Sequence, residues 1–330
     1  MSPAPNRAPG RLPQRWKPLA AFSIAFAVWV AGTQIALRTV PALEQARRRA
    51  AAIEYPDSTW YLAFKDGPQL DHYVLFHGLG RSIESARAAD ILVLGSSRTQ
   101  FGLPDAPLRA FERRHGVKIF HLGFGFSEPN AFPLEIIEKF DLRPKLVIVN
   151  ADGFTTARES TMAAEVRSKS RWRAAMILFE SFASSEVMPW LTTAIPRFVA
   201  PLPKPYLLRS TVTGSWRPVH WPHRDTPFSD NPFPVDLETW LPEARRFKEA
   251  MDRRGARIIL TCIPANPELC NPERTRELAR RLGVAAIVPW PPRLKMNDRY
   301  HLCQASGERF ANAFLHELAR SPELAAVTRR

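Results

Sequence analysis

The segment ILVLGSSRTQFG, residues 91–102, carries the strongest structural signal in this chain. Its first half is an apolar run of strand type that stops at a Gly-Ser-Ser turn. Open α/β sheets hold their ligands at the carboxyl ends of their strands, so this turn places a serine hydroxyl where a ligand would bind. Much further along the chain, MNDRYHLCQASGERF, residues 296–310, carries Asp-x-x-His just before an amphipathic helix. Together the two segments supply a nucleophile, a base and an orienting carboxylate.

From residue 89 onward, apolar runs of strand length alternate with helical patterns. We expect strands at 91–94, 117–122, 146–149, 257–263 and 284–288, and helices at 107–115, 129–140, 171–182, 237–254, 272–282 and 306–320. Alternation of this kind implies right-handed crossovers and a parallel sheet. The predicted fold class is therefore α/β, a three-layer α/β/α sandwich. Residues 196–235 are rich in proline and poor in periodicity, which predicts a long loop or cap.

The N-terminal part predicts a membrane anchor. Residues 18–37 are uncharged and long enough to cross a bilayer as one helix. A cleaved signal peptide is the alternative, but its apolar region is usually shorter and is followed by a small-x-small site. We favour an uncleaved signal anchor, with the N-terminus in the cytoplasm and the long C-terminal part outside. Positive charges lie on both sides of the stretch, so the positive-inside rule supports this orientation only weakly.

These patterns divide the chain into five parts. The expected division is a basic cytoplasmic tail at 1–17, the anchor at 18–37, a connecting region at 38–88, the α/β domain at 89–320 with an irregular insertion at about 155–235, and a tail at 321–330.

The formal net charge of +14 does not by itself indicate nucleic acid. Arginine greatly outnumbers lysine and is spread along the chain, and no nucleic-acid motif is present. Attraction to an anionic envelope polymer or lipid surface stays open. The three cysteines include no Cys-x-x-Cys pair, which argues against a zinc site. We expect no metal and no cofactor. Cys262 and Cys270 form a small disulfide loop outside the cytoplasm, or all three cysteines are free buried thiols.

The candidate catalytic residues are Ser97, His301 and Asp298. A serine hydroxyl is a weak nucleophile until a neighbouring base takes its proton, and His301 is that base if Asp298 fixes its tautomer. Ser96 is the second choice for the nucleophile. The alternatives are ordinary ones: serines often close a turn, and an Asp and a His can share a surface loop by chance.

This combination resembles the SGNH/GDSL hydrolase superfamily over roughly residues 88–320. Gly95-Ser96-Ser97 matches the first block of that family, which places Ser97 at the nucleophile, and Asp298 and His301 match its last block. The resemblance implies a flavodoxin-like sheet and an acyl-enzyme mechanism without a cofactor. The Asp-x-x-His-Leu block is the more specific of the two, because Gly-Ser-Ser is common.

The middle blocks of the family are altered here. The second block implies that a backbone N–H of Gly123 or Gly125 contributes to the oxyanion hole, although a glycine pair also suits a tight turn. In the third block Asn150 stands where the family has Gly, and Asp152 stands where it has the Asn that donates to the oxyanion. A carboxylate cannot donate unless it is protonated. Arg98 follows the nucleophile and either holds an anionic group or is an ordinary surface arginine.

Membrane-anchored relatives that assist O-acylation of envelope polymers resemble this pattern. The resemblance implies an extracytoplasmic esterase or O-acyltransferase at the inner membrane, acting on envelope polysaccharide with a multi-spanning acyltransferase as a partner. The alternative is a catalytically inactive SGNH-like protein that binds or assembles envelope polysaccharide. The intact Ser/His/Asp set favours the enzyme, and the altered third block favours the alternative.

Overall fold

The computed structural model describes residues 53, 55–64, 69–125, 128–154, 160–183, 205–219, 226–227, 237–265, 271–298 and 300–329. The expected anchor at 18–37 lies outside these residues. Within the described ranges, no helix combines the length and the apolar character that a membrane crossing requires.

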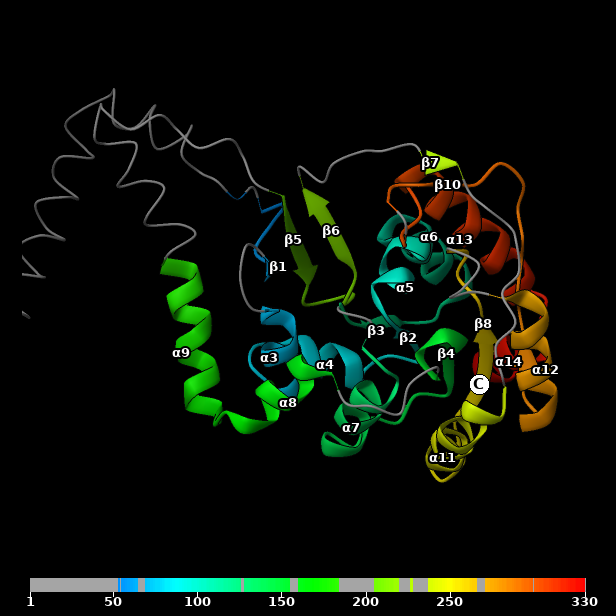
Figure 1. The fold of residues 1–330 in the computed structure, drawn as a ribbon, viewed down its shortest axis with the longest axis horizontal. Coiled ribbons are helices and arrows are strands. Elements are labelled where there is room, and N and C mark those ends of the chain that lie inside the picture. Colours follow the sequence, from blue (N-terminus) through cyan, green and yellow to red (C-terminus); the bar gives the residue numbers. More distant parts are fainter. Residues whose placement is uncertain are drawn as a thin grey trace, which may run out of the picture. The chain divides into compact units, whose positions relative to one another are not determined.

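A five-stranded sheet forms the centre of the fold (Figure 1). Its strands are β2 (Ile91–Gly95), β3 (Ile119–Gly123), β4 (Leu146–Asn150), β8 (Arg257–Thr261) and β9 (Ala285–Ala286), in the spatial order β3-β2-β4-β8-β9. Every neighbouring pair is parallel. All five residues of β2 are buried, which explains its continuous apolar run, because a central parallel strand is covered on both faces. The expected mixed α/β fold with a parallel sheet is confirmed.

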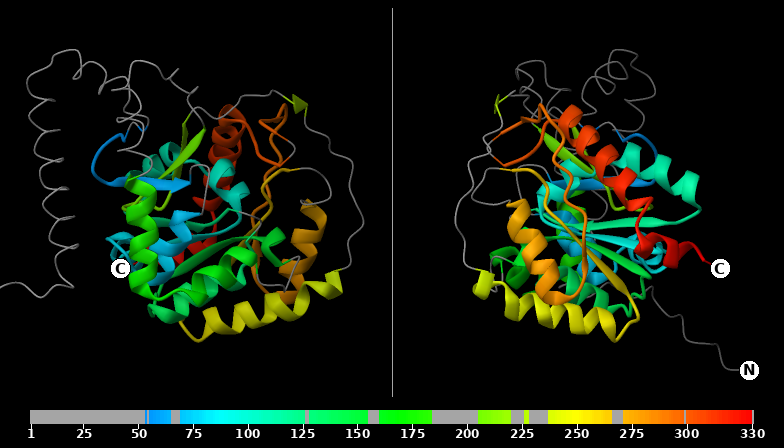
Figure 2. Two further views of the ribbon diagram at one scale, coloured as in Figure 1. Left: turned by 60° about the vertical axis from the view of Figure 1, so that its left-hand side comes forward. Right: turned by 90° about the vertical axis from the view of Figure 1, so that its right-hand side faces the viewer.

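Helices cover both faces of this sheet, as the two views of Figure 2 show. One face packs on α6 (Asp105–His115), α13 (Gln304–Leu318) and α14 (Pro322–Thr328). The other packs on α3 (Leu70–His77), α4 (Ser82–Arg87), α7 (Ala131–Lys139), α11 (Leu241–Asp252) and α12 (Pro272–Leu282). Successive residues of β2 alternate between the two cores: Ile91 and Val93 face the first, and Leu92 and Leu94 face the second.

Local sequence signals set several helix ends. The Asn271 side chain accepts a hydrogen bond from the Arg274 N–H at the start of α12, and Gly283 ends that helix with φ 65°. Gly116 ends α6 in the same left-handed conformation, with φ 64°. Glycine adopts this conformation without steric cost, so these positions predict the helix ends correctly.

The expectation of one long loop at 196–235 is wrong for residues 205–219. There β5 (Tyr206–Ser210) and β6 (Trp216–Val219) pair with β1 (Trp60–Phe64) in an antiparallel sheet of order β1-β5-β6. The strand partner of β5 lies far away in the sequence, so local periodicity could not predict the pairing. The remaining short elements are β7 (Thr226–Pro227), which pairs with β10 (Lys295–Met296), the 3₁₀ turns η2 (Ala151–Phe154) and η4 (Leu237–Thr239), and the helices α5 (Ser97–Gly102), α8 (Thr161–Ser168) and α9 (Arg171–Phe182).

Both ends of the expected α/β domain extend further than the sequence indicates. In the connecting region, α3 and α4 pack into the same core as the sheet. In the expected tail, Leu324 and Val327 of α14 are buried in the opposite core. Apolar residues in short helices are hard to recognise as core from sequence, because each helix contributes only two or three positions to the core cluster.

Candidate active site

A sharp turn between β2 and α5 presents Ser97. Gly95 ends β2 with φ 147°, and a Cβ there would lie 2.5 Å from the Thr99 Cγ2 atom, so only glycine fits. Ser96 is the N-cap of α5 and Ser97 is its first residue. Within residues 91–100, Ser97 alone is not buried. The turn therefore brings one hydroxyl to the accessible carboxyl edge of the sheet.

The C-terminal block meets this hydroxyl. The Ser97 Oγ atom lies 2.8 Å from the His301 Nε2 atom. The His301 Nδ1 atom lies 2.8 Å from Asp298 Oδ2 and 3.0 Å from Asp298 Oδ1. The Asp298 Oδ1 atom also accepts hydrogen bonds from the backbone N–H groups of Tyr300 and His301. Ser97, His301 and Asp298 thus form one continuous chain of hydrogen bonds.

The electrostatics of Asp298 set the His301 tautomer. Partial burial on its own raises the pKa of Asp298, but hydrogen bonds from the His301 ring and the backbone outweigh it and hold the pKa below its usual range. An ionised carboxylate only accepts hydrogen bonds, so the Nδ1 atom of His301 carries the proton. In the neutral ring the Nε2 atom is then the acceptor, and it faces Ser97. This is the arrangement that a general base requires.

The packing of α13 against α5 positions His301. A Cβ on Gly307 would lie 2.1 Å from the Phe101 carbonyl oxygen, so the two helices approach as closely as they do because residue 307 has no side chain. The Phe101 ring lies 4.7 Å from the His301 ring. The Asn297 N–H donates to the His301 carbonyl at 2.8 Å, which closes the Asp-x-x-His loop.

Ser96, the second choice for the nucleophile, faces elsewhere. It is 1% exposed, and its hydroxyl accepts from the Arg98 N–H at 3.4 Å at the start of α5. Its role is that of a helix cap. The contact with His301 belongs to Ser97.

Gly123, the last residue of β3, and Gly125 differ in what their backbone N–H groups contact. The Gly123 N–H donates to the Nδ1 atom of His121 at 3.2 Å, whereas no described residue accepts from the N–H of Gly125 or of Ser97. The Phe124 N–H donates to the carbonyl of Gly95, the last residue of the neighbouring strand β2. Gly125 is the next residue in the chain and therefore follows the last backbone contact between these two segments. Of the two candidates, Gly125 has the backbone N–H that is left for a ligand.

Asn150 and Asp152 are both engaged within the protein. The Asn150 side chain donates to Asp152 Oδ1 at 2.6 Å and accepts from the Ile263 N–H at 3.0 Å. The other carboxylate oxygen of Asp152 accepts from the Nε atom of Arg98. The structure therefore joins Arg98 to the third block, a link that the sequence did not predict.

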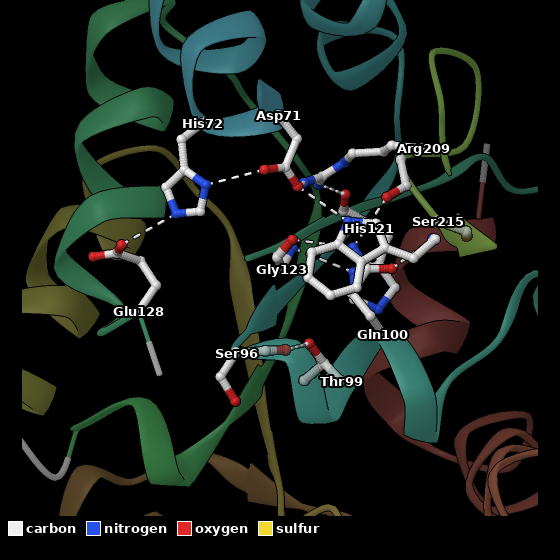
Figure 3. Close-up of polar contacts among 12 residues, drawn as sticks. Asp71, His72, Ser96, Thr99, Gln100, His121, Gly123, Glu128, Arg209 and Ser215 are labelled. Atoms are coloured by element: carbon white, nitrogen blue, oxygen red, sulfur yellow. Dashed lines mark hydrogen bonds and ion pairs between the residues drawn. The ribbon is translucent and has the colours of Figure 1, made fainter. Parts of the chain in front are cut away.

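A buried polar framework supports the turn that holds Ser97 (Figure 3). Gln100 on α5 donates to the carbonyls of Gly123 and Gly214, and it accepts from the Trp216 N–H. It thereby links α5 to β3 and to the β5–β6 turn. A single glutamine in the sequence gives no sign of this role.

A group of buried charged residues continues this polar framework from β5 to α3. Arg209 of β5 is fully buried and donates to Asp71 at 2.7 Å and to the His121 carbonyl at 2.7 Å. His72 lies between Asp71 and Glu128, at 3.0 and 3.2 Å (Figure 3). Burial lowers the pKa of His72, but the hydrogen bonds to Asp71 and Glu128 outweigh it and raise the pKa above its usual range. The sequence does not indicate this cluster, because its members come from three separate segments.

The cysteines behave differently from one another. Cys262 is disulfide-bonded and Cys303 is a buried free thiol. Cys270, the other residue of the expected loop, lies outside the described residues. Among the described residues, no group of three His, Cys, Asp or Glu side chains is arranged to hold a metal ion.

The comparisons with known proteins are sparse. No family model matches this chain, and no curated protein matches it. One solved structure, "Crystal Structure of TesA", is 12% identical in sequence and aligns over 70% of this chain and 98% of its own, with a TM-score of 0.32. A likeness of this size establishes neither a common function nor a common family.

Proposed function

We propose that this protein is a serine esterase or O-acyltransferase of the SGNH type, in which Ser97 is the nucleophile. The observation that carries the proposal is the hydrogen-bonded chain Ser97–His301–Asp298 at the carboxyl edge of a parallel sheet. Its three members come from two segments far apart in sequence, and they meet in the order that acyl transfer requires. A surface Asp and His that shared a loop by chance would have no reason to face a serine at a strand end.

The reaction follows from the contacts. His301 Nε2 takes the Ser97 proton while Oγ attacks the ester carbonyl, and the imidazolium is stabilised by Asp298. In this proposal the N–H groups of Ser97 and Gly125 donate to the oxygen that becomes negative. The protonated His301 then gives its proton to the leaving alcohol, which leaves an acyl group on Ser97. Water or a second hydroxyl attacks that ester while His301 takes its proton, and His301 then gives the proton to the Ser97 Oγ atom as the bond between Oγ and the acyl group breaks.

The cellular setting is the finer part of the proposal. An anchor at 18–37 places the domain outside the cytoplasm, on an inner membrane, with envelope polysaccharide as the acyl donor or acceptor and a multi-spanning acyltransferase as a partner. The disulfide at Cys262 supports an oxidising compartment. The absence of charged residues from 18–37 supports the anchor.

A second candidate is an inactive SGNH-like protein that binds or assembles envelope polysaccharide. One observation favours it: Asp152 stands at the place of the amide donor, and the Asn150 side chain is engaged by Asp152 and Ile263. Asp152 has no side-chain amide hydrogen to donate, and the Asn150 amide already donates to the Asp152 carboxylate.

Hydrolysis of 4-nitrophenyl acetate by the full chain in detergent separates the two candidates. We expect Ser97→Ala to lower kcat/KM by roughly 10³-fold or more. Ser96→Ala is the matched variant: it loses the cap of α5, at about 1 kcal/mol of stability, and keeps the nucleophile. Wild-type protein without measurable turnover, or Ser97→Ala with undiminished turnover, would support the inactive candidate.

A further inference from the structure

Arg98 is a buried cation whose two terminal nitrogens donate no hydrogen bond to any described residue. The residue is 6% exposed, and its Nε atom donates to the Asp152 carboxylate. No described residue accepts from its two terminal nitrogens, and neither of them is sealed from solvent. A guanidinium has five donors in one plane, so this contact leaves a short outward edge of donors.

The surroundings of Arg98 hold it in place. Asp152 receives Arg98 on one oxygen and the Asn150 amide on the other. Asn150 in turn accepts from the Ile263 N–H, which follows β8. A salt bridge that served stability alone would gain most from a two-pronged contact between guanidinium and carboxylate. Here the hydrogen bond to the carboxylate comes from the Nε atom of Arg98, and the two terminal nitrogens donate no hydrogen bond to Asp152.

The open edge belongs to the active site. Arg98 directly follows Ser97 on α5, and Asp152 lies in η2, the turn that follows β4, the strand that pairs with β2. The pair therefore spans the ends of two neighbouring strands at the edge where Ser97 is exposed. The Asp152 carboxylate accepts from the Nε atom of Arg98, so the terminal N–H groups are the donors that Arg98 offers to an anion beside Ser97.

We propose that the terminal nitrogens of Arg98 bind an anionic group, a carboxylate, on the substrate next to the ester that Ser97 attacks. Arg98 is the specificity-determining residue, and Asp152 and Asn150 are its positioning residues. The planar fork of a guanidinium matches the two oxygens of a carboxylate. The net charge of +14 draws anionic substrates toward the protein. This inference rests on the proposed function and names the substrate class of the same site.

The test uses a matched pair of acetyl esters, 3-acetoxybenzoate and its neutral methyl ester, at constant ionic strength. We expect wild-type kcat/KM to be roughly ten- to a hundredfold higher for the carboxylate, the range of a charge-assisted hydrogen bond. Arg98→Met should reduce this ratio to about one, mainly through the KM of the carboxylate. The double variant Arg98→Met with Asp152→Asn should do the same without leaving Asp152 buried without its cation. A third ester, 3-acetoxyphenyl phosphate, tests whether a tetrahedral anion is preferred instead, a result that would overturn the assignment of a carboxylate.

Arg143→Met is the control, because Arg143 is an exposed arginine whose partner Asp141 is also exposed. It removes one positive charge from the molecule and should leave the ratio unchanged. A wild-type ratio near one overturns the proposal. So does an Arg98→Met variant that loses turnover equally on both esters, because Arg98 would then act on the oxyanion or on the fold.

Binding of 3-hydroxybenzoate to Ser97→Ala protein, measured by calorimetry, separates this inference from the proposed function. Suppose that wild-type protein hydrolyses no ester, that Ser97→Ala protein binds 3-hydroxybenzoate, and that adding Arg98→Met weakens this binding about tenfold or more. The subsite is then retained and the esterase is rejected. Hydrolysis without a carboxylate preference, together with no such binding, retains the esterase and rejects the subsite.

Discussion

A single proton on His301 connects the residues of the site. Because Asp298 is ionised and can only accept, it keeps the proton on Nδ1 and leaves Nε2 free for Ser97. Ser97, Asp298 and His301 could be identified from two short motifs, since these motifs place each side chain at a strand end or in one tight loop. Their partners could not. Gln100 and the buried ion pairs use residue types that occur throughout the chain, and the sequence indicates Arg98 as a candidate but not its contact with Asp152.

Replacement of Asp298 by Asn tests the tautomer. The amide can donate to Nδ1, which then loses its proton to Nε2, so the ring can no longer accept from Ser97. We expect kcat to fall by roughly 10³- to 10⁴-fold with little change in the thermal midpoint. A loss of less than tenfold, measured on an activated acetyl ester, would mean that Asp298 does not set the tautomer.

Titration of His72 tests the buried charge cluster. Since its pKa is raised in the folded state, its contribution to stability is fully present below its unfolded pKa of about 6.5 and is lost as pH rises through the higher folded pKa. The opposite case is Asp71, whose lowered pKa affects stability only in acid. We expect the free energy of unfolding in urea to decline as pH rises above neutrality, and His72→Gln to lack that decline. Parallel pH profiles for the two proteins would contradict this assignment.

At the level of elements, the site depends on how closely α13 approaches α5. Gly307 permits this close approach because it has no side chain. The approach positions His301, which precedes the first residue of α13 by three residues. The longer helices, α6, α7, α9, α11, α12 and α13, and the parallel strands were predictable because their periodicity and end signals are local. The β1-β5-β6 sheet was not, since β5 contacts strands and charges contributed by distant segments, including Asp71 through Arg209.

Gly307→Ala should therefore affect catalysis through helix position. The added methyl group would collide with the Phe101 carbonyl, and backbone cannot move aside as a side chain can, so α13 must shift. We expect the protein to fold with reduced stability, by about 1–3 kcal/mol, and kcat to fall by roughly tenfold or more, because small misplacements of a base are costly. Ala311→Gly in the same helix is a control for stability without the collision. Equal activities for Gly307→Ala and wild type would show that the helix contact does not position His301.

At the scale of the whole molecule, the proposed setting is a tethered domain outside the cytoplasm. The apolar segment at 18–37 is the basis for the tether, and none of the contacts described above for Ser97, His301 and Asp298 involves that segment. The two claims are therefore independent, and either can fail alone.

An alkaline phosphatase fusion at the C-terminus tests the orientation, since that enzyme requires an oxidising compartment to form its disulfides. We expect an active fusion, and we expect the untagged protein to stay with membranes after a carbonate wash. Deletion of residues 18–37 should abolish both. Inactivity of the fusion would reverse the orientation, and release by carbonate would remove the anchor.

The central claim is that His301 activates Ser97 as a nucleophile. Covalent labelling with a serine-reactive fluorophosphonate, followed by peptide mass mapping, measures this directly. We predict one adduct on Ser97 in the wild-type chain, no adduct in Ser97→Ala, a rate of labelling reduced by roughly 10³-fold or more in His301→Ala, and retained labelling in Ser96→Ala. An unlabelled wild-type protein, or an adduct on any other residue that persists in Ser97→Ala, would contradict the account.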